Sequence, residues 1–282
     1  MKYRHTYHAG NFADVHKHVT LLALLEALKR KDKGFLYLET HAGRGTYDLS
    51  QGATEAEGGV ARLSTSGSSS EELQQYAATL SGYRAQQGNP RAYPGSPLIA
   101  VQALRAQDRA VFVELLHTEA RVLEHALAGT PRVRVESGDG FERLRAWLPP
   151  LERRGLTFID PPYEETSRDF SRVTAAVTET LRRFPTGVIA AWYPIKEEHT
   201  ITAWQAALEQ QLVCDAVMAE LWLYRRDSRV ALNGSGMLIV NPPYLLAERM
   251  RVWLPELQAQ LDVAQSGGTS IRTLAPGQAM PR

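Results

Sequence analysis

LTFIDPPYEE, residues 156–165, joins an apolar run of strand character to Asp160, two prolines and Tyr163. Proline has a fixed φ angle and no amide hydrogen, so it cannot continue a β-ladder. We therefore expect a strand to end at Asp160, with the prolines holding this carboxylate at the strand end and turning Tyr163 outward. GMLIVNPPYLL, residues 236–246, repeats the pattern with Asn241 in place of the aspartate. The sequence thus poses the question of which copy carries out chemistry.

Other short runs rich in β-branched and aromatic residues also end at Gly, Asp or Glu, and helical patterns separate them. The runs are residues 35–39, 110–114, 132–136, 156–160 and 187–193. This alternation is typical of βαβ units and a parallel sheet. Two further runs, residues 217–225 and 236–240, have only a turn-rich segment between them, so a hairpin would make the last strand antiparallel. The pattern predicts an α/β fold with a mostly parallel, seven-stranded sheet.

The composition is that of an ordinary globular protein. The 282 residues are 44% hydrophobic and 22% charged, and the net charge of +1 neither requires nor excludes a nucleic-acid partner. Cys214 is the single cysteine, so no internal disulfide is possible and no metal site is expected. The longest apolar helical run, residues 19–28, is too short for a membrane span, and no signal peptide precedes it. We expect a soluble, cytoplasmic protein.

One interval breaks the strand–helix alternation. Residues 46–93 contain the polar run STSGSSS and then a helical pattern that begins after Ser70. We interpret this interval as an inserted helical subdomain, and residues 1–45 with 94–263 as the main domain. Residues 264–282 contain little that could pack, so we expect an extended or loosely docked tail.

Ligands of open α/β sheets bind beyond the carboxyl ends of the strands. There the first strand leads into a turn with Gly43, and the second ends at Glu114, whose carboxylate can accept hydrogen bonds from ribose hydroxyls. Ser96 is a candidate N-cap of the helix between them, at a terminus suited to an anion. After the third strand, Asp139 can accept from an adenine amino group, and backbone amides around Gly140 can donate to the ring. These residues predict a nucleoside site.

At this point the sequence resembles a known family. A strand-end Asp-Pro-Pro-Tyr downstream of a glycine turn is similar to the amino-directed S-adenosylmethionine-dependent methyltransferases. More narrowly, the chain resembles the bacterial 23S ribosomal RNA adenine-N6 methyltransferases of the RlmJ type. The resemblance extends from the N-terminus to about residue 260 and rests on YRHTYHAGNFADVHKH, FLYLETHAGRG, YPGSPLIA, RRGLTFIDPPYE and WYPI.

The resemblance implies a Rossmann-like class I methyltransferase that binds S-adenosylmethionine and methylates 23S rRNA. It implies a monomer, with protein-free RNA or an early assembly intermediate as substrate. The cofactor contacts that it implies are Lys17, His18, His41, Gly43, Ser96, Glu114, Asp139, Gly140 and Asp160. Lys17 is a candidate partner of the methionine carboxylate. Tyr3 is implied beside the substrate pocket, and Lys2 and Arg4 next to it are suited to an RNA-contacting arm.

The chemistry of adenine methylation explains the DPPY motif. Adenine N6 is a weak nucleophile because its lone pair is delocalised into the ring. Asp160 and the carbonyl group of Pro161 can each accept an N6 hydrogen, which orients the nitrogen and stabilises developing positive charge. The resemblance implies Asp160 as the proton acceptor. Tyr163 can stack on the extruded base.

Several alternatives remain open from the sequence. An adenine-N6 DNA methyltransferase would share these residues but normally has a larger target-recognition domain than residues 46–93 provide. A protein-glutamine methyltransferase would favour asparagine in the motif, and a non-catalytic nucleotide-binding module would share only the fold. If the last strand is antiparallel, Asn241 leaves the sheet at the edge opposite the cofactor. We therefore assign chemistry to Asp160 and a structural role to Asn241.

Overall fold

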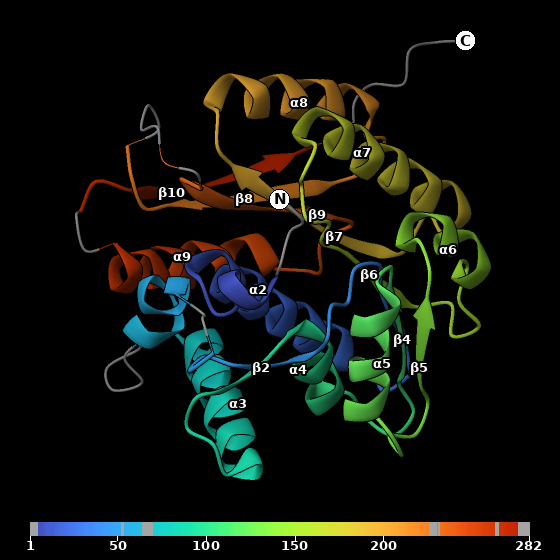
Figure 1. Ribbon diagram of the computed structural model, residues 1–282. Coiled ribbons are helices and arrows are strands. Elements are labelled where there is room, and N and C mark those ends of the chain that lie inside the picture. Colours follow the sequence, from blue (N-terminus) through green and yellow to red (C-terminus); the bar gives the residue numbers. More distant parts are fainter. Residues whose placement is uncertain are drawn as a thin grey trace.

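A single large sheet organises the computed structural model, which describes residues 5–51, 54–63, 70–225, 230, 232–262 and 265–275. Its eight strands lie in the order β10-β8-β9-β7-β6-β1-β4-β5 (Figure 1). The strands are β1 (Leu36–Glu39), β4 (Arg109–Glu114), β5 (Val133–Ser137), β6 (Gly155–Ile159), β7 (Val188–Ile195), β8 (Ala216–Trp222), β9 (Gly234–Val240) and β10 (Gly268–Leu274).

Helices cover both faces of the sheet. Helices α7 and α8 lie on one face and α2 and α9 on the other, as Figure 1 shows; α6 packs against α7, and α4 packs against α2. None of the described helices is long and apolar enough to cross a membrane. The helices are α1 (His5–His8), α2 (Phe12–Lys29), α3 (Glu71–Gln87), α4 (Ser96–Ala103), α5 (His117–Ala126), α6 (Gly140–Trp147), α7 (Thr166–Arg183), α8 (Glu198–Gln211) and α9 (Leu246–Leu261), with two 3-10 turns, η1 (Thr54–Gly58) and η2 (Val60–Arg62).

Strand direction agrees with the sequence prediction. Strands β5, β4, β1, β6 and β7 are parallel to one another, whereas β9 runs antiparallel to both β7 and β8. The predicted α/β fold and the antiparallel hairpin strand are therefore confirmed. Val240, the last residue of β9, pairs with Ile189 near the start of β7. The chain after β9 consequently emerges at the opposite edge of the sheet from the chain after β6.

The tail prediction is wrong for residues 268–274. This segment forms β10, which pairs antiparallel with β8 along its whole length, so the sheet has eight strands instead of seven. Residues 276–282 lie outside the described part of the chain. The segment has few apolar residues, and its strand structure comes from the backbone hydrogen bonds that β8 offers, which the local sequence does not reveal.

The interval from residue 46 to residue 93 begins and ends in a small antiparallel sheet of β2 (Thr46–Asp48) and β3 (Ala92–Pro94). Helix α3 lies between these strands in sequence and buries Leu73, Tyr76 and Leu80. Glu72 of the same helix is also buried and forms an ion pair with Arg249 of α9 at 2.8 Å. The helical character of the interval is as predicted, and its status as a separate subdomain stays a prediction.

Candidate active site

The carboxyl ends of four neighbouring strands bring the candidate site together. Glu39 ends β1, Glu114 ends β4, Asp139 follows β5, and Asp160 follows β6. These strands are adjacent in the sheet, and β1 lies between β4 and β6. The strand-end rule of parallel sheets therefore gathers four carboxylates that are far apart in the sequence.

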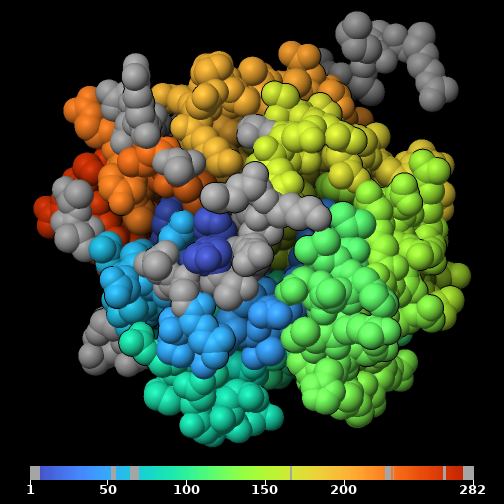
Figure 2. Space-filling view, viewed as in Figure 1, coloured from blue at the N-terminus to red at the C-terminus, as the bar shows by residue number. Residues whose placement is uncertain are grey.

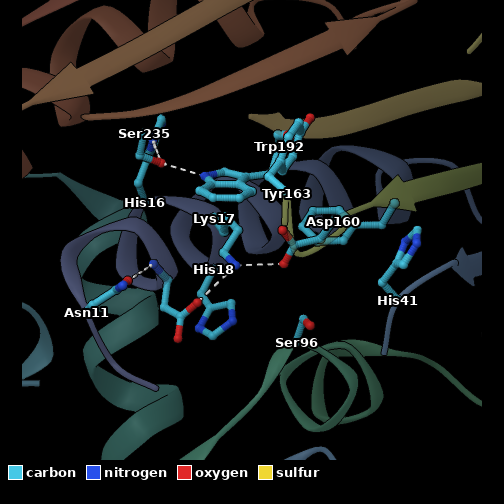
Figure 3. A network of polar contacts seen from close by, with 12 residues as sticks. Asn11, His16, Lys17, His18, His41, Ser96, Asp160, Tyr163, Trp192 and Ser235 are labelled. Atoms are coloured by element: carbon cyan, nitrogen blue, oxygen red, sulfur yellow. Dashed lines mark hydrogen bonds and ion pairs between the residues drawn. The ribbon is translucent and has the colours of Figure 1, made fainter. Parts of the chain in front are cut away.

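Helix α2 supplies the cation of the site. This helix is buried along almost its whole length, and its first turn is capped by Asn11, whose side chain accepts from the Asp14 amide at 2.9 Å. Lys17 Nζ lies 2.6 Å from Asp160 Oδ2 and 2.9 Å from Asp14 Oδ1, and its side chain is only 6% exposed (Figure 3). Its partners therefore include the buried or nearly buried carboxylates of Asp14 and Asp160, where the sequence predicted the methionine carboxylate.

Tyr163 does not point outward, so that prediction is wrong. Its side chain is 2% exposed, and its hydroxyl donates to the Trp192 carbonyl at 2.7 Å. The ring packs against Trp192 and Phe170, with centroid separations of 5.5 and 5.0 Å. The reason is the backbone at Tyr163, where φ is +50°: after two prolines the chain enters the left-handed region and turns the ring inward. Base stacking on this ring is therefore not supported by its position.

A hydrogen bond joins the glycine turn after β1 to the end of β4. Gly43 has a φ of +63° and donates its amide to Glu114 Oε2 at 2.8 Å, while Leu116 donates to Oε1 at 2.8 Å. A Cβ on Gly43 would lie 2.8 Å from the Tyr47 hydroxyl, so a side chain has no room there. A carboxylate has about four lone-pair sites, so ribose binding by Glu114 stays compatible with these two bonds.

A cavity of about 210 Å³ lies beyond β5 and β6, with His41, Asp139, Gly140, Pro161 and Arg172 in its lining. Asp139 accepts from the Phe141 amide at 2.9 Å as the N-cap of α6, and from Arg172 at 2.5 Å. His41 packs edge-on against the Phe141 ring, 4.7 Å between centroids. Burial lowers the pKa of His41 to about 4, so its imidazole is neutral near pH 7. A planar group with hydrogen-bond donors and acceptors matches this lining.

Gly140 lies where no side chain can be accommodated. A Cβ built on it would be 1.8 Å from the carbonyl oxygen of Thr40, the residue after β1. The close approach holds the start of α6 against the β1 loop, next to His41. The sequence predicted that backbone amides around Gly140 donate hydrogen bonds. Only the structure shows that a residue without a side chain is required there for packing against Thr40.

Ser96 is one residue further into α4 than predicted. Gly95 is the N-cap, Ser96 is the first helical residue, and Pro97 follows it. The Ser96 hydroxyl donates to Glu39 Oε1 at 2.5 Å instead of capping the helix. Glu39 also accepts from the Tyr37 hydroxyl at 2.9 Å and is fully buried.

Glu39 is the site residue that the sequence analysis missed. Its position at a strand end was the available signal, because the same reasoning selected Glu114. Burial is the main cause that raises its pKa to about 8; hydrogen bonds from Ser96 and Tyr37 oppose the shift and the charge of Asp160 adds to it. Glu39 is therefore largely protonated at pH 7 in this structure.

This shift predicts a pH dependence of stability. A carboxyl group with a raised pKa in the folded state favours folding below its ordinary pKa of 4.5, and this contribution is lost as pH rises toward 8. Glu39→Gln should therefore flatten the decline in the free energy of unfolding between about pH 5 and pH 8, by up to a few kcal/mol at about 1.4 kcal/mol per pKa unit. Urea unfolding of both proteins across this range measures the difference, and parallel curves would contradict the prediction.

His18 lies on the side of α2 that faces the inserted interval. Its Nδ1 is 2.9 Å from the Tyr93 hydroxyl, which in turn lies 3.1 Å from the Tyr76 hydroxyl. The His18 side chain is 3% exposed and packs among these rings.

Lys2, Tyr3 and Arg4 lie outside the described residues. Within the described chain, no group of His, Cys, Asp and Glu is arranged to hold a metal ion.

Asn241 has the structural role predicted for it. Its side-chain amide donates to the carbonyls of Pro185 and Gly187 at 2.8 and 2.9 Å, and its φ is +51°. These contacts close the chain after β9 onto the loop before β7, at the sheet edge opposite Asp160. The DPPY and NPPY copies thus lie at opposite ends of the strands, and their backbones differ: the positive φ angle is at Tyr163 in the first copy and at Asn241 in the second.

The fold and the strand-end site define the class I methyltransferases, and comparison with known proteins gives the family. The family model described as "Ribosomal RNA large subunit methyltransferase D, RlmJ" matches residues 32–274. The chain therefore belongs to this family. The expected enzyme class, a methyltransferase with S-adenosylmethionine as its cofactor, is confirmed by this membership.

Relatives and a solved structure agree with the family. The ribosomal RNA large subunit methyltransferase J of Escherichia coli is 39% identical, over 98% of this chain and 99% of that protein. The protein of the same name from Haemophilus influenzae is 36% identical over the same shares. The crystal structure of protein LPL1258 from Legionella pneumophila is 32% identical with a TM-score of 0.83, covering 96% of this chain and 99% of that one.

Proposed function

We propose that this protein transfers a methyl group from S-adenosylmethionine to the exocyclic N6 of an adenine in 23S ribosomal RNA. The observation that carries the proposal is Asp160, which β6 holds at the sheet edge with its carboxylate 2.6 Å from Lys17, next to the cavity lined by His41, Asp139 and Pro161. The family and its ribosomal RNA relatives support an RNA substrate. We further propose that the protein acts as a cytoplasmic monomer on protein-free or early assembly RNA.

The residues of this chain account for the activation of an amino group. Asp160 and the Pro161 carbonyl each offer an acceptor, so an adenine amino group bound between them is held with its lone pair directed away from both. The carboxylate also stabilises the positive charge that develops on N6 and accepts the proton that the nitrogen releases. Lys17 fixes the carboxylate, because the ammonium group is itself held by Asp14.

The residues present also match the cofactor. S-adenosylmethionine, when bound, supplies an electrophilic methyl group on a sulfonium. His41, Asp139 and Gly140 line the cavity suited to its adenine, and Glu114 at the end of β4 is placed for ribose hydroxyls. Gly43, Ser96 and Glu39 surround the turn after β1, where the methionine part would lie.

The proposal is tested by incubating purified protein with methyl-labelled S-adenosylmethionine and, separately, protein-free 23S rRNA, 16S rRNA, duplex DNA and assembled ribosomes. Nucleoside mass spectrometry then identifies the product. We expect N6-methyladenosine in the protein-free 23S rRNA alone. Label in the DNA would indicate the DNA methyltransferase alternative, and cofactor binding without any transfer would indicate a non-catalytic nucleotide-binding module.

A further inference from the structure

Trp192 on β7 packs against two residues of the candidate site, Lys17 and Tyr163. Lys17 Nζ lies 4.9 Å from the centroid of its indole ring, and Tyr163 packs edge-on against it at 5.5 Å (Figure 3). The Trp192 carbonyl also accepts the Tyr163 hydroxyl at 2.7 Å. Trp192 thus contacts both the cation that pairs with Asp160 and the last residue of the DPPY motif. Movement of the indole would displace both groups.

Two buried polar residues fix the orientation of this indole. The Trp192 Nε1–H donates to Ser235 Oγ on β9 at 2.9 Å, and Ser235 Oγ lies 2.9 Å from His16 Nδ1 on α2. The side chains of Ser235 and His16 are both 0% exposed. An indole nitrogen can only donate, so the serine oxygen accepts this bond, and the same oxygen is hydrogen-bonded to His16 Nδ1. The result is a hydrogen-bonded chain from Trp192 through Ser235 to His16.

His16 is suited to be the end of this chain and not a proton carrier. Burial lowers its pKa to about 3, so its imidazole is neutral near pH 7. Its Nε2 has no hydrogen-bond partner among the described residues, and the ring packs against Trp253 at 6.1 Å between centroids. Of its two nitrogens, therefore, only Nδ1 takes part in the chain.

We infer that Ser235 and His16 are positioning residues for methyl transfer, which hold the Trp192 indole and thereby the Lys17–Asp160 pair and Tyr163 in place. This inference rests on the proposed function, because it concerns the same site. Neither residue touches Asp160. Their effect would therefore fall on the geometry of the reacting groups, where a displacement of about 1 Å costs up to 10²-fold in rate.

The first test compares Ser235→Ala with Tyr193→Phe. Ser235→Ala removes the acceptor of the indole N–H. Tyr193 follows Trp192 on β7 and faces the other side of the sheet, where its buried hydroxyl donates to Glu220 at 3.1 Å. Ser235 Oγ contacts Trp192 and His16, and the Tyr193 hydroxyl contacts Glu220 and Gln205, so each variant loses two buried hydrogen bonds made by one hydroxyl group. We expect Ser235→Ala to lower kcat about tenfold with little change in the KM for RNA, and Tyr193→Phe to change kcat less than about twofold.

The second test uses the two nitrogens of His16. Asparagine places a hydrogen-bonding amide where Nδ1 lies and lacks the Nε2 position, whereas leucine has a similar volume and no hydrogen-bonding group. His16→Asn should therefore retain most of the wild-type kcat, and His16→Leu should resemble Ser235→Ala. Equal kcat for His16→Asn and His16→Leu, or wild-type kcat in folded Ser235→Ala, would overturn the inference.

A readout that needs no activity separates this inference from the proposed function. The indole N–H resonance of Trp192, assigned as the signal lost in Trp192→Phe, should shift in Ser235→Ala and His16→Leu and stay in place in Tyr193→Phe. Wild-type protein that methylates no RNA would overturn the proposed function. An indole resonance that Ser235→Ala leaves unmoved would overturn the positioning chain, whatever the activity.

Discussion

Asp160→Ala is expected to lower kcat for methyl transfer by about 10²- to 10³-fold, the range for loss of one preorganised polar group at a reacting centre. In the proposed reaction, the variant removes the acceptor that would orient the amino group and receive its proton. Lys17 keeps Asp14 at 2.9 Å, so the buried ammonium retains one partner and the chain should fold. Single-turnover transfer to 23S rRNA measures the rate, with circular dichroism as the check on folding.

Asn241→Ala is the matched control, because Asn241 begins the second copy of the motif at the opposite sheet edge. Its loss removes two hydrogen bonds to the loop before β7 and leaves alanine at a φ of +51°. We expect a loss of about 1–3 kcal/mol in the free energy of unfolding, with kcat unchanged. Loss of turnover in well-folded Asn241→Ala, together with activity in Asp160→Ala, would reverse the assignment of the two motifs.

Gly140→Ala should weaken cofactor binding by about 10- to 100-fold, because overpacking costs about 1–3 kcal/mol and about 1.4 kcal/mol is a tenfold change in Kd. The added Cβ would lie 1.8 Å from the Thr40 carbonyl, so the start of α6 must move away from the β1 loop. That movement disturbs Asp139 at the helix N-cap and the contact of His41 with Phe141. Isothermal titration with S-adenosylmethionine measures the Kd directly.

Gly82→Ala provides the matched control for that substitution. Gly82 is an exposed residue of α3, and a Cβ there meets nothing within 4 Å. Alanine in a helix interior is favoured over glycine by about 1 kcal/mol, so this variant should be slightly more stable and bind the cofactor normally. A Kd for Gly140→Ala as low as that of Gly82→Ala would contradict the close-packing explanation.

Much of the fold and part of the site could be predicted because both depend on strand ends. A strand that stops at a carboxylate is visible in the sequence, and parallel strands bring such ends to one edge. Glu114, Asp139 and Asp160 were identified in this way, and the antiparallel hairpin separated Asp160 from Asn241.

Side-chain orientation could not be predicted in the same way. The prolines of the DPPY motif indicated correctly that the strand ends there. They gave no sign that the positive φ angle at Tyr163 turns its ring into the core. Lys17 looked like a ligand for an external carboxylate because its internal partner Asp160 lies far away in the sequence. Glu39 looked like an ordinary strand residue because its raised pKa depends on burial beneath Ser96.

The N-terminal part of the chain lies close to the residues of the candidate active site. Figure 2 shows the described N-terminal residues, in dark blue, reaching the surface in the middle of this face, between the light-blue inserted interval and the yellow-green residues of α7. Tyr7 in this region is 51% exposed. This face of the molecule is thus composed of segments from distant parts of the sequence.

The short strand β10 has a consequence for the solubility of the folded chain. Strand β8 is seven residues long and largely apolar, and without β10 one of its edges would present unpaired backbone amides and carbonyls. Such an edge is a template for pairing with other chains and so for aggregation. Strand β10 covers it with a sequence that contains Arg272 and several hydroxyl residues. The last strand therefore protects the molecule against self-association, and shortening the chain before residue 268 would remove that protection while leaving the methyl-transfer groups in place.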